Sequence, residues 1–267
     1  MVNSFWGLEY NPFTLNTNDK NFFETFDFKQ SLSRLNHLKN TKGIGLFTGT
    51  SGVGKTFSLR HFVNSLNPNL FKVVYIALST VTVLEFYKSL ASHLNLEVKN
   101  KKVDLFDSIQ NRIYNLVTKK KVFPVIIIDE AQYLKTDVLN DIKILLNFNM
   151  DSKNCSIFIL NGQPVLNNIL SKSLHEALYQ RIVISYTFTG ISDDEVDQYI
   201  ISRLKLAGCV EPIFDKNSLT AIKSCISGSI RKLNLLVEKC LIIAFKDKLR
   251  SINTDIVMAA QNEISLI

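Results

Sequence analysis

The glycine-rich stretch GTSGVGKT, at residues 49–56, is the part of the sequence whose residue types and spacing point most directly to a chemical role. It matches the pattern G-x-x-x-x-G-K-[ST] at every fixed position, between an expected strand at 45–48 and a helix-like segment at 58–66. Glycines allow a backbone to fold around a phosphate and to turn successive N–H groups toward it. The alternative, a chance glycine-rich turn before a helix, fits this context poorly. The sequence therefore predicts a nucleotide site.

Each side chain of this loop has an expected role. Lys55 is placed to reach the β- and γ-phosphates of ATP, and the Thr56 hydroxyl to ligate Mg²⁺. The rest of the loop should contribute backbone N–H groups. Phe57, directly after the loop, should also lie beside the nucleotide. The remaining predicted ATP-binding residues of this stretch are Gly49, Thr50, Ser51, Gly52, Val53, Gly54 and Phe57.

Two adjacent carboxylates, Asp129 and Glu130, follow the apolar run Val125–Ile128. Ligands bind at the carboxyl ends of strands in parallel sheets, so this position suits a reactive pair. Magnesium-dependent hydrolysis needs one carboxylate near the metal and a second that orients the attacking water. We expect Asp129 on the magnesium side and Glu130 as the catalytic residue that polarises water. For an isolated pair, a solvated turn would be the simpler interpretation.

Three further polar residues are candidates for the nucleotide site. For each of them an ordinary structural role is the alternative. Asn161 follows the apolar run 157–160 and could hold the same water or the γ-phosphate, although Asn-Gly is also a turn signal. Arg181 precedes the expected fifth strand and could reach the site of an adjacent subunit or form a surface salt bridge. Arg231 opens an expected helix, from which it could touch the γ-phosphate or only solvent. Periodicity alone does not decide between the two alternatives for either arginine.

The elements that must position these residues read as a three-layer α/β domain with a parallel sheet, at residues 29–190. Almost wholly apolar strands are typical of a parallel sheet that is covered on both faces. After residue 190 the sequence shows only helix-like segments, beginning with the capping box of Ser192 and Glu195. We therefore expect a small all-helical lid domain at 191–267. The strands are expected at 45–48, 72–78, 122–128, 155–160 and 182–188.

The first 28 residues are rich in aromatic side chains and read as an irregular arm held to the body by those side chains. We expect its Asn11, Pro12 and Phe13 to lie beside the adenine of the bound ATP. Plain core packing is the alternative for each single aromatic residue.

Composition sets broad limits on function. The net charge of +7 suits a polyanionic partner without demonstrating one. The four cysteines form no C-x-x-C pair and lie in apolar surroundings, so we expect buried, reduced thiols and no metal site. The sequence shows neither a secretory signal nor an apolar run of membrane-spanning length. These features predict a soluble, cytoplasmic protein.

The motifs GTSGVGKT, VIIIDEAQ, Asn161 at a strand end, LYQRI with Arg181, and GSIRKLN with Arg231 resemble those of the AAA+ ATPases in order and spacing. They correspond to Walker A, Walker B, sensor 1, arginine finger and sensor 2. The resemblance implies an AAA+ fold, Mg-dependent hydrolysis of ATP to ADP and phosphate, and Arg181 acting on a neighbouring subunit. More narrowly, FWGLEYNPF, NGQPVL and SGSIRKLNLL resemble the ExeA-type branch. Ser229-Ile230 departs from it, because many relatives carry a proline there.

The ExeA-type branch includes transposition regulators of the TnsC, TniB and MuB kind. Its secretion-type members continue into a transmembrane helix and a peptidoglycan-binding region, whereas this sequence ends at Ile267 with neither. The resemblance therefore implies a homo-oligomer, a ring or helical filament, that forms on double-stranded DNA with ATP, without sequence specificity. It would recruit a transposase, with a target-selector protein as a further candidate partner, and hydrolysis would drive disassembly. The alternative is an ExeA-like ATPase of secretion or envelope assembly that acts on protein partners.

Two lysine clusters could contact DNA phosphates, which would contribute affinity without base specificity. One lies between two expected helices and the other precedes the Walker B strand; solvated loops are the alternative for both. The first is favoured, because a loop between helices can project into a central channel. The candidates are Lys99, Lys101, Lys102, Lys119, Lys120 and Lys121, with Thr80 and Thr82 as weaker ones.

Overall fold

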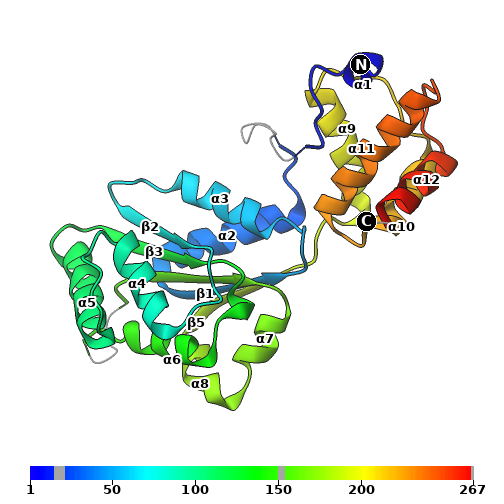
Figure 1. Ribbon diagram of the computed structural model, residues 1–267. Helices are drawn as coiled ribbons and strands as arrows, with labels where there is room; N and C mark the ends of the chain where they lie inside the picture. Colours follow the sequence, from blue (N-terminus) through cyan, green and yellow to red (C-terminus); the bar gives the residue numbers. More distant parts are fainter. Residues whose placement is uncertain (15–21, 150–153, 266–267) are drawn as a thin grey trace. The chain divides into compact units, whose positions relative to one another are not determined.

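The structure is a computed structural model that describes residues 1–14, 22–149 and 154–265. It divides into two compact units (Figure 1). The sheet unit comprises Gln30–Gly49 and Lys55–Phe188. The helical unit comprises Met1–Lys29, Thr50–Gly54 and Thr189–Ile267. The glycine-rich loop at 50–54 thus groups with the helical unit, while the residues on both sides of it belong to the sheet unit. The domain limits at 28 and 190 stay predictions.

The sheet unit is built on a five-stranded parallel sheet in the order β2-β3-β4-β1-β5. Alternate apolar side chains of the strands point to opposite faces, and almost all of those in β1, β3 and β4 are buried. This confirms the expected parallel sheet. The strands are β1 (Gly43–Gly49), β2 (Phe71–Ile76), β3 (Phe123–Ile128), β4 (Ile157–Gly162) and β5 (Ile182–Phe188).

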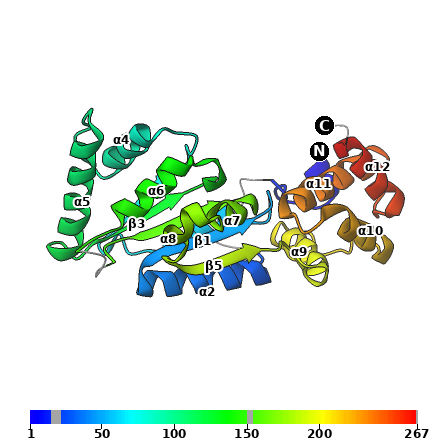
Figure 2. The same cartoon turned by 90° about the horizontal axis from the view of Figure 1, so that it is seen from below.

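Helices cover both faces of this sheet, which makes three layers. Figure 2 shows α4, α5 and α6 on one side of the sheet and α2 on the other. On the first side, Ile126, Ile128 and Phe158 pack into one core with those helices. On the second side, Leu38 of α2 lies so close to β1 that a Cβ on Gly45 would be 2.5 Å from its Cδ2. The helices of this unit are α2 (Phe26–Thr41, whose first turn belongs to the helical unit), α3 (Lys55–Ser65), α4 (Val83–His93), α5 (Lys102–Thr118), α6 (Thr136–Leu145), α7 (Val165–Leu170) and α8 (Glu176–Tyr179), with 3-10 turns η1 (Ala131–Tyr133) and η2 (Ser173–His175).

The helical unit has its own core, to which the N-terminal segment contributes Trp6, Leu8 and Phe13. Trp6 Nε1 donates to the carbonyl of Leu241 at 3.1 Å, and the Arg203 guanidinium donates to the carbonyl of Pro12. The capping box of Ser192 and Glu195 is present as predicted. The helices are α1 (Val2–Phe5), α9 (Asp193–Leu206), α10 (Lys216–Ile226), α11 (Ile230–Lys246) and α12 (Thr254–Ser265).

Several elements differ from expectation. The N-terminal arm was expected to be irregular, but it begins with the short helix α1, and residues 15–21 of it lie outside the described residues. Strand β4 was expected to end at 160, yet it runs to Gly162, because Asn161 and Gly162 pair with Phe47 and Thr48 of β1. Asn161 is therefore the penultimate residue of its strand and is held by the sheet ladder.

Candidate functional site

The sheet unit brings the predicted polar residues of three strands together at the carboxyl edge of its sheet. Asp129 follows β3, Asn161 lies at the end of β4, and Lys55 and Thr56 begin α3 shortly after β1. Parallel strands place these ends side by side, and β3, β4 and β1 are neighbours in the sheet. The geometry around Asp129 shows how tightly they are joined.

Asp129 is buried, with 6% of its surface exposed, and both of its carboxylate oxygens accept hydrogen bonds. Oδ1 accepts from Asn161 Nδ2 at 2.6 Å and from the backbone N–H of Glu130 at 2.9 Å. Oδ2 accepts from the Tyr75 hydroxyl at 2.7 Å and from Thr56 Oγ1 at 3.4 Å. Donors on both oxygens fix the orientation of the carboxylate, with Oδ2 on the side of the Thr56 hydroxyl.

Tyr75 is a site residue that the sequence did not reveal. It lies one residue before the end of β2, and burial, followed by the hydrogen bond to Asp129, raises the pKa of its phenol. The phenol therefore stays protonated and acts as a donor. Within the run KVVYIAL a tyrosine reads as an ordinary strand residue, so the one available signal was its place near a strand end.

Glu130 has a left-handed backbone conformation, with φ 49° and ψ 40°. A residue with a side chain is strained in this conformation, and such strain concentrates at functional sites. Its carbonyl accepts from Ser79 Oγ at 2.9 Å, and its side chain accepts from Gln132 Nε2 at 2.5 Å. Its side chain is exposed to solvent at the carboxyl edge of the sheet, next to Asp129.

Lys55 is buried, and its Nζ donates to the carbonyl of Gly49 at 2.7 Å. The ammonium group thus folds back to the last residue of β1. A phosphate oxygen is a stronger acceptor than this carbonyl, so a bound phosphate can draw the ammonium group away from it.

In the helical unit, the loop at 50–54 contacts the start of α11. Arg231 Nη1 donates to Ser51 Oγ at 3.1 Å, and the backbone N–H of Arg231 donates to the carbonyl of Gly52 at 3.2 Å. Gly52 has φ +84°, and a Cβ there would lie 2.5 Å from Ser229 Oγ and 2.8 Å from Arg231 Cβ. Glycine is required for both reasons. The structure therefore places Arg231 on the glycine-rich loop, and its contact with the γ-phosphate stays a prediction.

The residues present fit Mg²⁺ and ATP. Asn161 Oδ1 is buried and accepts no hydrogen bond within residues 1–14, 22–149 and 154–265, so it can accept one from a bound water. Thr56 and Asp129 offer hard oxygen atoms, the ligands Mg²⁺ prefers. Among the described residues, no group of three or more His, Cys, Asp or Glu side chains could hold a metal ion by protein ligands alone.

Arg181 is not brought to this site within its own chain. It precedes β5, at the amino edge of the sheet, whereas Asp129 lies at the carboxyl edge, about 20 Å away along strands of this length. Arg181 Nη1 donates to the carbonyl of Lys143 at 2.9 Å, and the residue is half-buried. Its role toward a neighbouring subunit stays a prediction.

The two lysine clusters lie at opposite ends of α5, about 25 Å apart for a helix of this length. Lys102 forms a salt bridge with the buried Asp141 at 2.7 Å, which gives it a structural role. Thr82 caps α4 through Glu85, which gives it one as well. The remaining candidates are exposed, and within the described ranges none of their side chains caps a helix or forms a salt bridge: Thr80, Lys99, Lys101, Lys119, Lys120 and Lys121.

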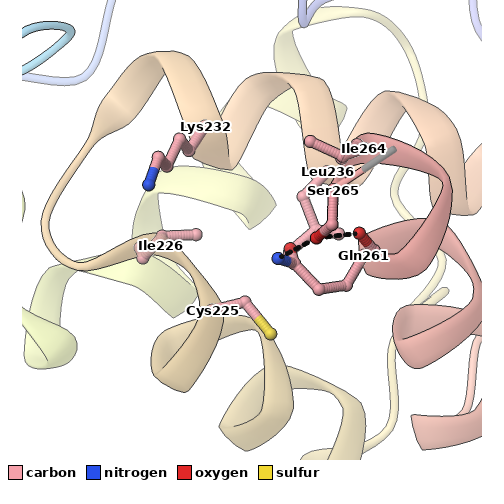
Figure 3. Close-up of a pocket in the computed structure, with 7 residues that line it drawn as sticks. All are labelled: Cys225, Ile226, Lys232, Leu236, Gln261, Ile264 and Ser265. Atoms are coloured by element: carbon pink, nitrogen blue, oxygen red, sulfur yellow. Dashed lines mark hydrogen bonds between the residues drawn. The ribbon is translucent and has the colours of Figure 1, made fainter. Parts of the chain in front are cut away.

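A separate cavity of about 200 Å³ lies within the helical unit, between α10, α11 and α12 (Figure 3). Its lining combines apolar side chains with Lys232, Gln261 and Ser265. Cys225 faces it and is only half-buried, against the expectation that all four thiols are buried. In the part of the chain that the structure describes, no helix is long and apolar enough to cross a membrane.

Comparison with known proteins agrees with this geometry. Residues 38–170 match the AAA_22 family, an AAA domain. General secretion pathway protein A of Aeromonas hydrophila is 32% identical over 265 residues, or 97% of this chain, which spans 48% of that relative. The Aeropyrum pernix ORC2 protein, solved in ADPNP-ADP complexes, has a TM-score of 0.67 at 15% identity, over 96% of this chain and 72% of that chain. The Aeropyrum pernix ORC1 protein in complex with DNA has a TM-score of 0.64 at 16% identity, over 94% and 68%. The expected AAA+ fold is confirmed.

Proposed function

We propose, from the premise that this chain is an ATPase of the AAA type, that it is a nucleotide-driven switch in which ATP hydrolysis at the carboxyl edge of the sheet changes its grip on a macromolecular partner. The observation that carries the proposal is the Asp129 network, which joins the ends of β2, β3 and β4 to Thr56 at the start of α3. Mg²⁺ and ATP are the cofactor and substrate that these residues suit.

The residues divide the work of hydrolysis among them. Mg²⁺, when bound, supplies Lewis-acid stabilisation of charge on the phosphate oxygens. Lys55 and the loop N–H groups bind the phosphates, while Thr56 and Asp129 hold the metal side. Glu130 orients a water and accepts its proton as the water oxygen attacks the γ-phosphorus, and the bond to ADP breaks. Asn161 holds the γ-phosphate or the same water through its buried amide.

Arg231 is the residue that would report nucleotide state to the helical unit. Its side chain and backbone both bond the glycine-rich loop, so a phosphate bound in that loop would compete for the guanidinium. A switch needs a difference in interaction energy between two states, and this competition supplies one. Asn11, Pro12 and Phe13 remain our candidates for contact with the adenine.

For the partner, the first candidate is double-stranded DNA, bound without sequence specificity by a homo-oligomer that regulates transposition together with a transposase. The exposed lysines at the ends of α5 support a phosphate-binding surface, and the ORC1 protein that shares the fold is solved in complex with DNA. The transposase and a target selector rest on the motif resemblance alone.

The test is anisotropy of a fluorescent random-sequence duplex, titrated with protein in ATP, in ADP and without nucleotide, across a salt series. We expect salt-sensitive binding in ATP that Lys55→Ala abolishes. Replacement of Lys99 and Lys101 by alanine should lower the slope of log K against log salt by about 0.9 for each DNA phosphate that the variant no longer neutralises. Lys172→Ala, an exposed lysine elsewhere in the sheet unit, is the matched control. Absence of binding in every nucleotide state would refute the DNA candidate.

A second candidate is favoured by one observation, the 32% identity to general secretion pathway protein A. On this candidate the ATPase acts on protein partners of secretion or envelope assembly. The same titration separates the two, because a protein that binds and hydrolyses ATP but never binds the duplex would favour this candidate.

A further inference from the structure

Gln132 lies between the two strand ends that carry the proposed chemistry. It is the middle residue of the 3-10 turn η1, which begins directly after Glu130, and it is half-buried. Its Oε1 accepts from the backbone N–H of Gln163, just beyond the end of β4, at 3.0 Å. Its Nε2 donates to Glu130 Oε2 at 2.5 Å. One amide therefore bridges the Glu130 carboxylate and the end of the strand that carries Asn161.

The direction of this amide follows from chemistry. A backbone N–H can only donate, so the Gln132 oxygen must face Gln163, and the NH₂ group is left to face Glu130. A hydrogen bond to a carboxylate is among the stronger ones in a protein and sets its orientation. The Glu130 side chain is exposed, and among the described residues the bond from Gln132 is the one hydrogen bond that restrains its carboxylate.

The space around the amide is also restricted. A Cβ on Gly162, the last residue of β4, would lie 2.6 Å from Gln132 Oε1 and 3.3 Å from the Gln132 backbone nitrogen. Gly162 is buried and its φ is not positive, so a side chain there would be disfavoured by lack of space: it would have to displace the Gln132 amide and press on Leu166, whose Cδ2 would lie 3.1 Å from the Cβ.

We propose that Gln132 is a positioning residue for hydrolysis, which holds the Glu130 carboxylate toward the attacking water and ties its position to the end of β4. The proposal rests on the proposed role of Glu130. Since Asn161 lies two residues before Gln163, a shift of this strand end on contact with the γ-phosphate is passed to Glu130 through a single side chain. Glu130 is thereby poised for water when ATP, and not ADP, is bound.

The test is steady-state ATP hydrolysis by Gln132→Ala and Gln132→Glu. The second variant keeps the shape and the acceptor for Gln163, but it removes the donor and places a like charge beside Glu130. We expect kcat to fall by about 10- to 100-fold in both, the size of loss that misplacement of a catalytic group produces, with KM and ATP affinity within about twofold of wild type. Gln261→Ala, an amide in the helical unit, is the matched control and should match wild type.

A double-mutant cycle distinguishes positioning from general structural support. In single-turnover assays, Gln132→Ala should add less than about twofold to the loss caused by Glu130→Gln, because a residue that acts through Glu130 has no effect without it. Independent, multiplicative losses would overturn the proposal, as would unchanged kcat in both Gln132 variants. If Glu130→Gln itself hydrolyses ATP normally, it is the proposed function of Glu130 that fails.

Gly162→Ala gives a second route to the same conclusion without touching Gln132. The added methyl group displaces the amide and should lower kcat as Gln132→Ala does. In the Gln132→Ala background it should have little further effect on kcat. A loss of equal size in both backgrounds would show that Gly162→Ala acts elsewhere and would count against the proposal.

Discussion

At the scale of single residues, the site is organised by the four donors around Asp129. Asn161 and the Glu130 N–H fix Oδ1, which leaves Oδ2 to Tyr75 and Thr56. Oδ2 is the oxygen on the side of Thr56, the proposed metal ligand, so the phenol of Tyr75 would compete with Mg²⁺ or its water for the same atom. A phenol is protonated at neutral pH in any case, and burial raises the pKa of Tyr75 further, so the hydrogen bond to Asp129 persists into alkaline solution.

This competition predicts the effect of Tyr75→Phe. Loss of one partly exposed hydrogen bond to the carboxylate should lower the Mg²⁺ concentration for half-maximal hydrolysis by about two- to fivefold, which corresponds to about 0.5–1 kcal/mol. The rate at saturating Mg²⁺ should stay close to wild type. Tyr179→Phe, an exposed tyrosine in α8, serves as control. A higher Mg²⁺ requirement would instead show that Tyr75 supports the metal site.

At the scale of elements, the backbone just after β5 packs closely against a second backbone segment of the helical unit. The two segments meet at Gly190 and Gly228. Gly190 has φ +94°, and a Cβ there would lie 2.1 Å from the carbonyl oxygen of Gly228. The N–H groups of Thr189 and Gly190 donate to Asp27 Oδ2, which is buried, at 2.8 and 2.6 Å. The backbone crossing at this point therefore excludes any side chain.

Gly190→Ala should destabilise the helical unit by about 2–4 kcal/mol, from positive-φ strain together with overpacking. Gly7→Ala is the matched control, because Gly7 also has a positive φ, +66°, but nothing lies within 4 Å of its Cβ position. It should cost only the strain, about 1–2 kcal/mol. The measurement is urea unfolding followed by fluorescence of Trp6, the single tryptophan, in the core of this unit. Equal unfolding midpoints for the two variants would show that overpacking against Gly228 contributes nothing to the loss of stability in Gly190→Ala.

The elements also show why the sequence predicted part of the site. Asp129 and Lys55 follow from local patterns, since an apolar strand before a carboxylate pair and a glycine loop before a helix each fix their own neighbourhood. Tyr75 was missed because its partner Asp129 follows another strand, and Gln132 because its role depends on Gln163, which follows β4; strand order is not local information. The end of β4 was misplaced for the same reason, because its pairing with β1 decides it.

At the scale of the whole molecule, the position of Arg181 bears on assembly. It lies at the amino edge of the sheet, so it cannot complete the site of its own chain, and the predicted role requires a second copy. In the described structure its guanidinium donates to the carbonyl of Lys143, a bond that would be exchanged for phosphate contacts in an oligomer.

A mixing experiment tests this prediction. Lys55→Ala subunits should lack nucleotide but carry Arg181, and Arg181→Ala subunits should bind ATP but lack the arginine, so each alone should be inactive. A mixture should hydrolyse ATP at a rate well above the sum of the two, because Arg181 of one subunit can serve the intact site of another. A rate equal to the sum would remove Arg181 from any role between subunits.

The most direct test of the proposed hydrolysis at the Asp129 network is phosphate release from ATP by wild type and Glu130→Gln, with ATP binding measured on the same samples. We predict that wild type hydrolyses ATP with Mg²⁺, and that Glu130→Gln loses about 10²- to 10⁴-fold in rate, the contribution of a general base, while it still binds ATP. Wild-type turnover by Glu130→Gln, with ATP binding intact, would contradict this mechanism.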